Sequence, residues 1–234
     1  MPIRPYKNLF FDLDDTLWAF SENARDTFRE MYDKYGYGRY FRSFDHFYAL
    51  YTERNLQLWE EYGQGCITKD ELNRIRFFHP LQQVGVEDAG LAQAFARDFF
   101  AVIPTCRKLM PHAREVLEYL SARYRLYILS NGFRELQYRK MCAAGIDGYF
   151  RKVILSEDIG LLKPRKELFD FALSATQSEA KESLMIGDNW ENDITGARNA
   201  GWHQAYYVPD DDASPLPFNP TYRIRDLREL TDFL

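Results

Sequence analysis

LFFDLDDT, residues 9–16, is the stretch that decides the fold of this 234-residue chain. Its first three residues form a continuous apolar run that leads directly into Asp12. A strand that is apolar on both faces is typical of a buried parallel sheet in an α/β protein. Acidic side chains placed directly after such a strand lie at its carboxyl end, which is where open α/β sheets bind their ligands.

Similar apolar runs recur in the second half of the chain. Apolar runs of strand length occupy residues 126–129, 153–155, 184–186 and 205–208. Segments with helical patterns lie between or beside them, at residues 113–123, 134–144, 167–175 and 192–200. Strands that alternate with helices in this way predict a parallel α/β sheet with helices on both faces. A polar turn over residues 210–215 is expected before a last strand and helix.

Residues 20–105 differ, because they carry helical patterns and no convincing strand. Phe28, Met31, Tyr32 and Tyr35 follow the spacing of one helix face, and residues 44–51 repeat that spacing. We therefore expect a helical bundle that is inserted after the first strand. The α/β core is then made of residues 1–19 and 106–234.

Composition argues against two classes of function. With a net charge of −5 and no stripe of lysine and arginine, the chain is not expected to bind a nucleic acid polymer. No apolar stretch approaches the length of a membrane span, and the N-terminus lacks the apolar segment of a secretory signal. The widely spaced Cys66, Cys106 and Cys142 predict reduced thiols that are buried as small core residues, and therefore a cytoplasmic protein.

Three carboxylates are expected near one edge of the predicted sheet. Asp12 and Asp14 are two residues apart on one strand end, so their side chains point the same way, and Asp188 follows another apolar run, with Asp193 five residues later at the start of a helix. Anions held this close need a cation or a shared proton. Strand-end carboxylates of this kind form an all-oxygen site that Mg²⁺ accepts. A single pair would more often be solvated turn residues, but the whole set favours a metal site.

Two further groups follow apolar runs. Ser130, Asn131 and Gly132 come directly after the second core run, where a hydroxyl and backbone N–H groups can bind phosphate oxygens. Lys163 stands before a proline, downstream of the third core run. Alone, the first group could be an ordinary turn and the lysine an ordinary surface residue.

In chain order these groups read DxDxT, SNG, KP and GDxxxxD, and this set resembles the haloacid-dehalogenase-like superfamily over nearly the whole chain. The resemblance implies a Rossmann-like parallel sheet core with helices on both faces and an inserted α-helical cap. It also implies Mg²⁺-dependent hydrolysis of phosphate monoesters through an aspartyl-phosphate. Small-molecule phosphate esters are then the expected partners.

The same resemblance implies a role for individual residues. Asp12 would be the nucleophile, and Asp14 would be the general acid and base. Ser130 and the adjacent N–H groups of Asn131 and Gly132 would bind the phosphate. Lys163 would stabilise the charge on the phosphate oxygens.

The metal site is implied in the same way. Mg²⁺ would be held by Asp12, the backbone carbonyl of Asp14 and Asp188. Asp193 would act from just outside this set, by orienting a metal-bound water or Lys163.

Within the superfamily, the closest resemblance is to pyrimidine 5′-nucleotidases that act on modified nucleotides. It is carried by residues that include 58–62, 65–68, 76–77, 131–133 and 136–137. A bound base can stack on flat side chains, and the inserted segment offers Trp59, Tyr62, Arg76, Phe77 and His79. Aromatic residues in such a segment are, however, also what the core of a helical bundle contains.

Other interpretations stay open. Phosphoglycolate or a sugar phosphate could be the substrate, and a sugar-phosphate mutase would keep all four motifs. A signalling receiver also forms an aspartyl-phosphate, but it needs only one small domain. A phosphate binder without activity is expected to have lost a motif residue, and none is missing. True haloacid dehalogenases share the nucleophile but lack an acid two residues further on, so Asp14 favours phosphate esters.

Overall fold

The computed structural model describes residues 6–209 and 215–234, so most of the polar turn expected at residues 210–215 lies outside the described residues. The chain divides into two compact units. An α/β unit contains the chain up to Phe20 and again from Arg107, and a helical unit contains Ser21–Cys106.

The α/β unit is built on a sheet that has six parallel strands among the described residues. These are β1 (Asn8–Phe11), β2 (Arg125–Ser130), β3 (Lys152–Leu155), β4 (Ser183–Gly187), β5 (His203–Tyr207) and β6 (Tyr222–Ile224). Their order is β3-β2-β1-β4-β5-β6, and all neighbours are parallel. In the central β1, Phe11 pairs with Ile128 of β2 and Ile186 of β4. The carboxyl ends of these three strands therefore meet at one edge, and the predicted fold class is confirmed.

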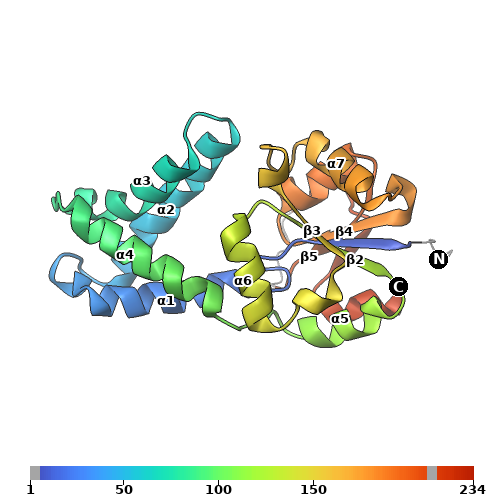
Figure 1. The fold of residues 1–234 in the computed structure, drawn as a ribbon, viewed down its shortest axis with the longest axis horizontal. Helices are drawn as coiled ribbons and strands as arrows, with labels where there is room; N and C mark the ends of the chain where they lie inside the picture. Colours follow the sequence, from blue (N-terminus) through green and yellow to red (C-terminus); the bar gives the residue numbers. More distant parts are fainter. Residues whose placement is uncertain (1–5, 210–214) are drawn as a thin grey trace. The chain divides into compact units, whose positions relative to one another are not determined.

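Helices cover both faces of this sheet (Figure 1). They are α5 (Ala113–Ser121), α6 (Arg134–Ala144) and α7 (Lys166–Thr176), with 3₁₀ turns at Asp147–Tyr149, Ser156–Asp158, Ala180–Glu182 and Leu227–Asp232. Figure 1 shows α7 and α5 on opposite sides of the strands. Phe10 of β1 and Met185 of β4 pack in one buried cluster with Phe169 of α7. The apolar runs are thus buried beneath helices, as a parallel sheet requires.

One helix is built differently from the prediction. The sequence predicts a single helix over residues 192–200, whereas the structure has a π-helical turn at Trp190–Thr195 followed by α8 (Gly196–Asn199). At its start, Asn189 N donates a hydrogen bond of 3.1 Å to the side chain of Asp193. Ile194 N donates to Asn189 O at 3.4 Å, and this bond across five residues is what makes the turn π-helical. Such π-helical turns often occur at functional sites.

Four helices form the helical unit. They are α1 (Phe20–Lys34), α2 (Phe44–Gly63), α3 (Lys69–Gln83) and α4 (Ala89–Val102), with 3₁₀ turns at Tyr37–Arg39 and Ile103–Thr105. Polar side chains cap three of them: Ser43 accepts from His46 N, Thr68 from Glu71 N and Asp88 from Leu91 N. Each such cap stabilises its helix by about 1 kcal/mol.

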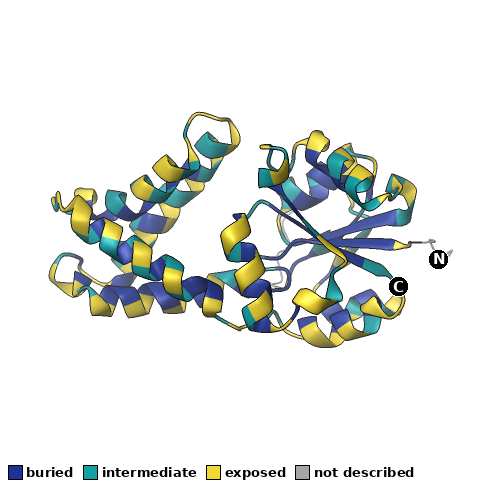
Figure 2. Cartoon of the chain, in the orientation of Figure 1, coloured by how far each residue is buried: buried dark blue, intermediate teal, exposed yellow. Residues whose placement is uncertain are grey.

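The interior of the helical unit is aromatic. The ring centroid of Phe28 in α1 lies 4.3 Å from those of Tyr51 and Phe99. Phe77 is only 2% exposed and packs against the same two rings. It is therefore a core residue of the bundle, which was the alternative to base stacking. Arg76 is buried beside it. The remaining flat side chains considered for base stacking are partly exposed: Trp59, Tyr62 and His79. In Figure 2 every helix of this unit carries both buried and exposed residues.

Two expectations from composition can be compared with the structure. Within residues 6–209 and 215–234, no helix is both long and apolar enough to cross a membrane. The three cysteines are free thiols, as expected, but the prediction that they are core residues is wrong, because Cys66 and Cys142 are exposed and Cys106 is half-buried. The buried Met141 and Ala144 mark the inward face of α6, which leaves Cys142 on the outer face.

Candidate active site

Asp12 occupies the carboxyl end of the central strand β1. Its backbone N donates to Ile186 O of β4 at 2.9 Å, so the sheet fixes its position. The residue is 8% exposed, and its Oδ1 accepts a hydrogen bond from Lys163 Nζ at 2.6 Å. Burial raises the pKa of Asp12 well above its ordinary value, Lys163 lowers it, and the neighbouring carboxylates raise it again.

Lys163 is a buried cation, with 3% of the residue exposed. Its Nζ donates to Asp12 Oδ1 and Asp193 Oδ1, both at 2.6 Å, and to Leu129 O at 2.8 Å. Burial alone would lower the pKa of Lys163, but Asp12 and Asp193 together raise it. The ammonium group is therefore held in its charged form beside the predicted nucleophile.

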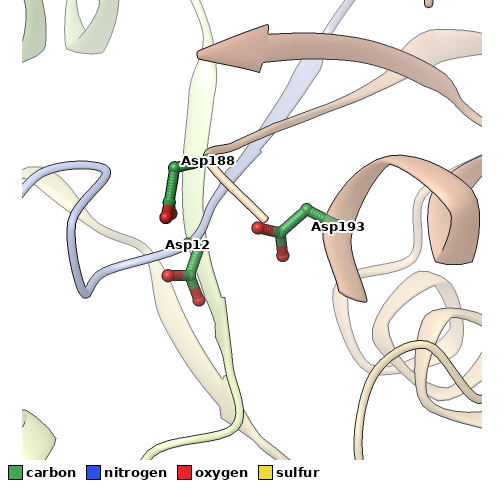
Figure 3. A group of neighbouring side chains, drawn as sticks. All are labelled: Asp12, Asp188 and Asp193. Atoms are coloured by element: carbon green, nitrogen blue, oxygen red, sulfur yellow. The ribbon is translucent and has the colours of Figure 1, made fainter. Parts of the chain in front are cut away.

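Asp12, Asp188 and Asp193 bring their carboxylates together (Figure 3). One oxygen of each lies within 4.8 Å of the others. Burial, and then repulsion by Asp193, raises the pKa of Asp188 to about 7. Three carboxylates beside one lysine leave two negative charges to be balanced when all are ionised, and a divalent cation balances them. Oxygen donors of this kind suit Mg²⁺, so the residues fit the predicted metal.

Asp193 differs from the other two carboxylates because donors occupy both of its oxygens. Lys163 Nζ bonds Oδ1, and Asn189 N donates to Oδ2 at 3.1 Å. Gly187 makes room for it, since a Cβ at that position would lie 2.3 Å from Oδ2. The other two carboxylates are therefore better placed to bind a metal directly, while Asp193 orients Lys163.

Thr16 holds Asp188 in place. Its Oγ1 donates to Asp188 Oδ1 at 2.7 Å and accepts from Asp188 N at 3.1 Å. Thr16 is the last residue of the DxDxT motif, and the sequence analysis gives it no role. The spacing of the motif marks Thr16 in the sequence. The contact of its hydroxyl with Asp188 depends on the pairing of β4 with β1, which the sequence does not show.

The residues of the SNG motif form hydrogen bonds within the motif, with Gln137 and with Lys163. Ser130 ends β2, is buried, and accepts from Gly132 N at 3.1 Å and from Gln137 Nε2 at 2.8 Å. The side chain of Asn131 donates to Lys163 O at 3.0 Å and accepts from Lys163 N at 2.8 Å. Asn131 thus positions Lys163, which is a task that the sequence analysis missed. The expected contacts of these residues with a phosphate stay predictions.

Asp14 is held by two residues of α6 to which the sequence analysis gives no chemical role. Lys140 Nζ lies 2.7 Å from Asp14 Oδ1 and 3.0 Å from Oδ2. Gln137 Nε2 donates to Oδ2 at 3.0 Å. Gln137 lies in a segment that carries the nucleotidase resemblance, but polar residues three apart on a helix usually lie on a solvated face, so the sequence did not predict the contacts of this pair with Asp14. Metal binding by the backbone carbonyl of Asp14 stays a prediction.

These groups can together transfer and stabilise an anionic group. A buried carboxylate can act as a nucleophile, and a second carboxylate two residues later can act as an acid and base. A charged lysine and a hydroxyl stand at the same edge of the sheet. Positioning and charge neutralisation of this sort are what phosphoryl transfer demands of a protein.

Known proteins are similar to this chain over nearly its full length. The family model described as haloacid dehalogenase-like hydrolase matches residues 6–201. The HAD-hydrolase YfnB of Bacillus subtilis is 30% identical over 234 residues, which cover 99% of this chain and 97% of YfnB. The pyrimidine 5′-nucleotidase YjjG of Escherichia coli is 31% identical over 227 residues, which cover 97% of this chain and 96% of YjjG.

Solved structures share the fold. The crystal structure of YfnB bound to magnesium has a TM-score of 0.86 at 29% identity and covers 97% of both chains. A 2-haloacid dehalogenase from Pseudomonas syringae has a TM-score of 0.69 at 25% identity, again over 97% of both chains. Since the family match spans most of the sequence and the motif residues converge at one edge of the sheet, this chain belongs to the haloacid dehalogenase-like hydrolase family.

Proposed function

We propose that this hydrolase is a Mg²⁺-dependent phosphatase that cleaves phosphate monoesters through a phosphorylated Asp12. The observation that carries the proposal is the buried Asp12 carboxylate, held by Lys163 at 2.6 Å and within 4.8 Å of the carboxylates of Asp188 and Asp193. Repulsion in this cluster would oppose an anionic substrate unless a divalent cation is bound. The reaction is therefore expected to need Mg²⁺.

The first half-reaction transfers the phosphoryl group to the protein. An oxygen of Asp12 attacks phosphorus, and the bond from phosphorus to the ester oxygen breaks. Asp14 gives its proton to the departing alkoxide, which leaves as the alcohol. Lys163 and Ser130 stabilise the charge on the phosphoryl oxygens during the transfer. The products are an acyl phosphate on Asp12 and an ionised Asp14.

The second half-reaction restores the enzyme. Asp14 takes a proton from a water molecule, and the water oxygen attacks phosphorus. The bond between phosphorus and Asp12 breaks, so inorganic phosphate is released. One residue serves as acid and then as base because the first step leaves it deprotonated.

Asp12 and Asp188, with the backbone carbonyl of Asp14, are the residues proposed to hold Mg²⁺. Thr16 fixes the direction of the Asp188 carboxylate through its two hydrogen bonds. Asp193 fixes the lysine that lies beside the metal ligands. When bound, the ion supplies positive charge that draws the substrate phosphate toward the nucleophile.

A nucleoside 5′-monophosphate with a pyrimidine base is the proposed substrate. The support is the 31% identity with YjjG, a pyrimidine 5′-nucleotidase, over 97% of this chain. Phosphoglycolate and sugar phosphates are the alternatives in the same reaction class. A cytoplasmic location belongs to the same proposal, and the free thiols Cys66 and Cys142 on the surface suit a reducing compartment.

Dehalogenases of the same fold make hydrolytic dehalogenation the second activity to test. A halide leaves without a proton, so a dehalogenase has no use for a general acid two residues after its nucleophile. Here Asp14 occupies that position, and buried polar residues hold its side chain. This observation favours phosphate esters.

A substrate panel tests the proposal. Hydrolysis of p-nitrophenyl phosphate should require Mg²⁺ and stop in excess chelator, and 2-chloropropionate should release no chloride. Values of kcat/KM for uridine, thymidine and adenosine monophosphates are then compared with those for phosphoglycolate and hexose phosphates. Full activity in chelator contradicts the dependence on Mg²⁺, and no hydrolysis of any phosphate ester with Mg²⁺ contradicts the phosphatase proposal. A sugar phosphate or phosphoglycolate that leads by about tenfold, a difference of 1.4 kcal/mol, contradicts the nucleotidase proposal alone.

The covalent step has its own test. Asp14→Asn should slow hydrolysis of the intermediate, while an activated ester still phosphorylates Asp12. Intact-mass measurement after rapid acid quench should then show one added phosphoryl group in the variant and little in the parent. A parent protein that stays phosphorylated for minutes would instead indicate a signalling receiver.

A further inference from the structure

Lys140 is a buried ammonium group that faces Asp14. The residue is 3% exposed, and its Nζ lies 2.7 Å and 3.0 Å from the two oxygens of Asp14. The rings of Trp18 and Phe20 also lie close to this group, with centroids 4.6 Å and 5.1 Å from Nζ. A buried lysine that contacts both carboxylate oxygens and packs against aromatic rings limits the rotation of that carboxylate.

Gln137 holds the same carboxylate from one helical turn away. It is fully buried, and its Nε2 donates to Asp14 Oδ2 at 3.0 Å and to Ser130 Oγ at 2.8 Å. One amide group therefore connects the predicted acid with the predicted phosphate-binding hydroxyl. Since Gln137 and Lys140 are three residues apart on α6, they present these groups from a single helix face.

Gly132 makes room for this contact. A Cβ at that position would lie 2.2 Å from Gln137 Nε2 and 2.4 Å from its Cδ. Any other residue at position 132 would displace the amide group from Asp14 and Ser130. The glycine of the SNG motif therefore serves the acid as well as the phosphate-binding turn.

We propose that Lys140 and Gln137 are positioning residues that hold Asp14 in the geometry that proton transfer needs, a role that rests on the proposed phosphatase function. A general acid must stand within hydrogen-bond distance of the leaving oxygen, and a small misplacement lowers the rate strongly. The two residues act on Asp14 and not on the nucleophile. Their loss should therefore lower kcat, and it should do so most for esters whose leaving group needs a proton.

A purely structural role predicts different results. If the pair served only the fold, removing one partner would lower stability, and any loss of turnover would have no reason to depend on the leaving group. Lys140→Met keeps the length of the side chain against Trp18 and Phe20 but removes the charge. Lys140→Arg keeps the charge. Lys166→Met is the matched control, because Lys166 forms an exposed ion pair with Asp170 on α7.

The test compares phenyl phosphate, which has the poorer leaving group, with p-nitrophenyl phosphate. In Lys140→Met, kcat for phenyl phosphate should fall by about tenfold to a hundredfold with KM nearly unchanged. Release of p-nitrophenol in the first turnover should fall much less. Lys140→Arg should recover part of the loss, and Lys166→Met should match the parent. If Lys140→Met does not fold, Lys140→Gln, which also removes the charge, carries the same expectations.

A double-mutant cycle decides whether Lys140 acts through Asp14. In an Asp14→Asn background, adding Lys140→Met should change kcat by less than about twofold, because the residue to be positioned is already gone. An equal loss in both backgrounds, or an equal loss for both esters, overturns the inference and leaves the proposed function standing. A folded parent that hydrolyses neither ester with Mg²⁺ overturns both.

Discussion

Both units of this protein bury apolar cores, but one of them also buries a cluster of charged residues. In the α/β unit, charged residues that include Asp12, Lys163 and Asp193 are buried and bonded to one another at one edge of the sheet. In the helical unit, buried positions are mainly aromatic, with Phe28 in contact with several rings. Buried charge is costly and is typical of functional sites, whereas aromatic burial gives stability. Substitutions in the two regions should therefore separate activity from stability.

The largest effect is expected from Asp12→Asn. The change removes the proposed nucleophile and one metal ligand, so kcat for p-nitrophenyl phosphate should fall by about 10³-fold or more. Without Mg²⁺, the melting temperature should stay at or above that of the parent, because burial and neighbouring carboxylates raise the pKa of Asp12 and disfavour its charge. Asp33→Asn, at an exposed position in α1, is the control. A variant within tenfold of the parent would remove Asp12 from the mechanism.

Phe28→Ala should produce the opposite pattern. Truncation of a fully packed phenylalanine costs about 3–5 kcal/mol of unfolding free energy, through lost burial and the cavity left behind. Urea denaturation followed by circular dichroism measures this loss. Leu56→Ala is the control, since that side chain in α2 is 67% exposed. A loss below about 1 kcal/mol would mean that the aromatic cluster does not stabilise the helical unit as its contacts indicate.

Thr16→Val should weaken metal binding and leave the fold intact. The valine removes both hydrogen bonds to Asp188, and groups that orient a metal ligand are worth about tenfold to a hundredfold in affinity. Isothermal titration of the metal-free protein with Mg²⁺ gives the dissociation constant. Thr52→Val, which removes an exposed hydroxyl bonded to helix backbone, should bind Mg²⁺ like the parent. An unchanged constant in Thr16→Val would place the ion away from Asp188.

The smallest effect concerns pH. Burial and repulsion by Asp193 raise the pKa of Asp188 to about 7 in the folded protein, against about 3.9 when unfolded. The folded state thus binds this proton more tightly, so its contribution to stability is complete below the unfolded value and is lost as the pH rises through 7. Without Mg²⁺, the melting temperature of the parent should fall more between pH 5.5 and pH 8 than that of Asp188→Asn. Equal slopes would contradict the raised value.

Residues whose chemistry is set by their position along a strand could be predicted from the sequence. Asp12 and Ser130 follow apolar runs, and the parallel sheet brings those strand ends to one edge. The alternation of apolar runs with helical segments predicts the sheet and its flanking helices. It also predicts that Asp12 and Asp188 lie close together. The helical spacing of apolar residues in the inserted segment likewise predicted helices at α1 and α2.

Residues whose role depends on a partner far along the chain could not be predicted in this way. Lys140 meets Asp14 across 126 positions of sequence, and Thr16 meets Asp188 across 172. Each looks ordinary in its own segment. The same reason explains Cys142: a small residue in a helix is buried or exposed according to which face packs, and Cys142 follows the buried Met141 onto the other face.

Backbone hydrogen bonds join the two segments through which the chain leaves the α/β unit and returns to it. Ala19 N donates to Lys108 O at 3.1 Å, Met110 N donates to Leu17 O at 2.9 Å, and Trp18 pairs with Leu109 as an antiparallel bridge. The two ends of the insertion are therefore anchored side by side on the catalytic framework itself. Because loop closure costs only about 0.6 kcal/mol for each doubling of length, excursions of very different size can be spliced between such anchors. An insertion of a different length can therefore join the α/β unit at this point with little change in its free energy of folding.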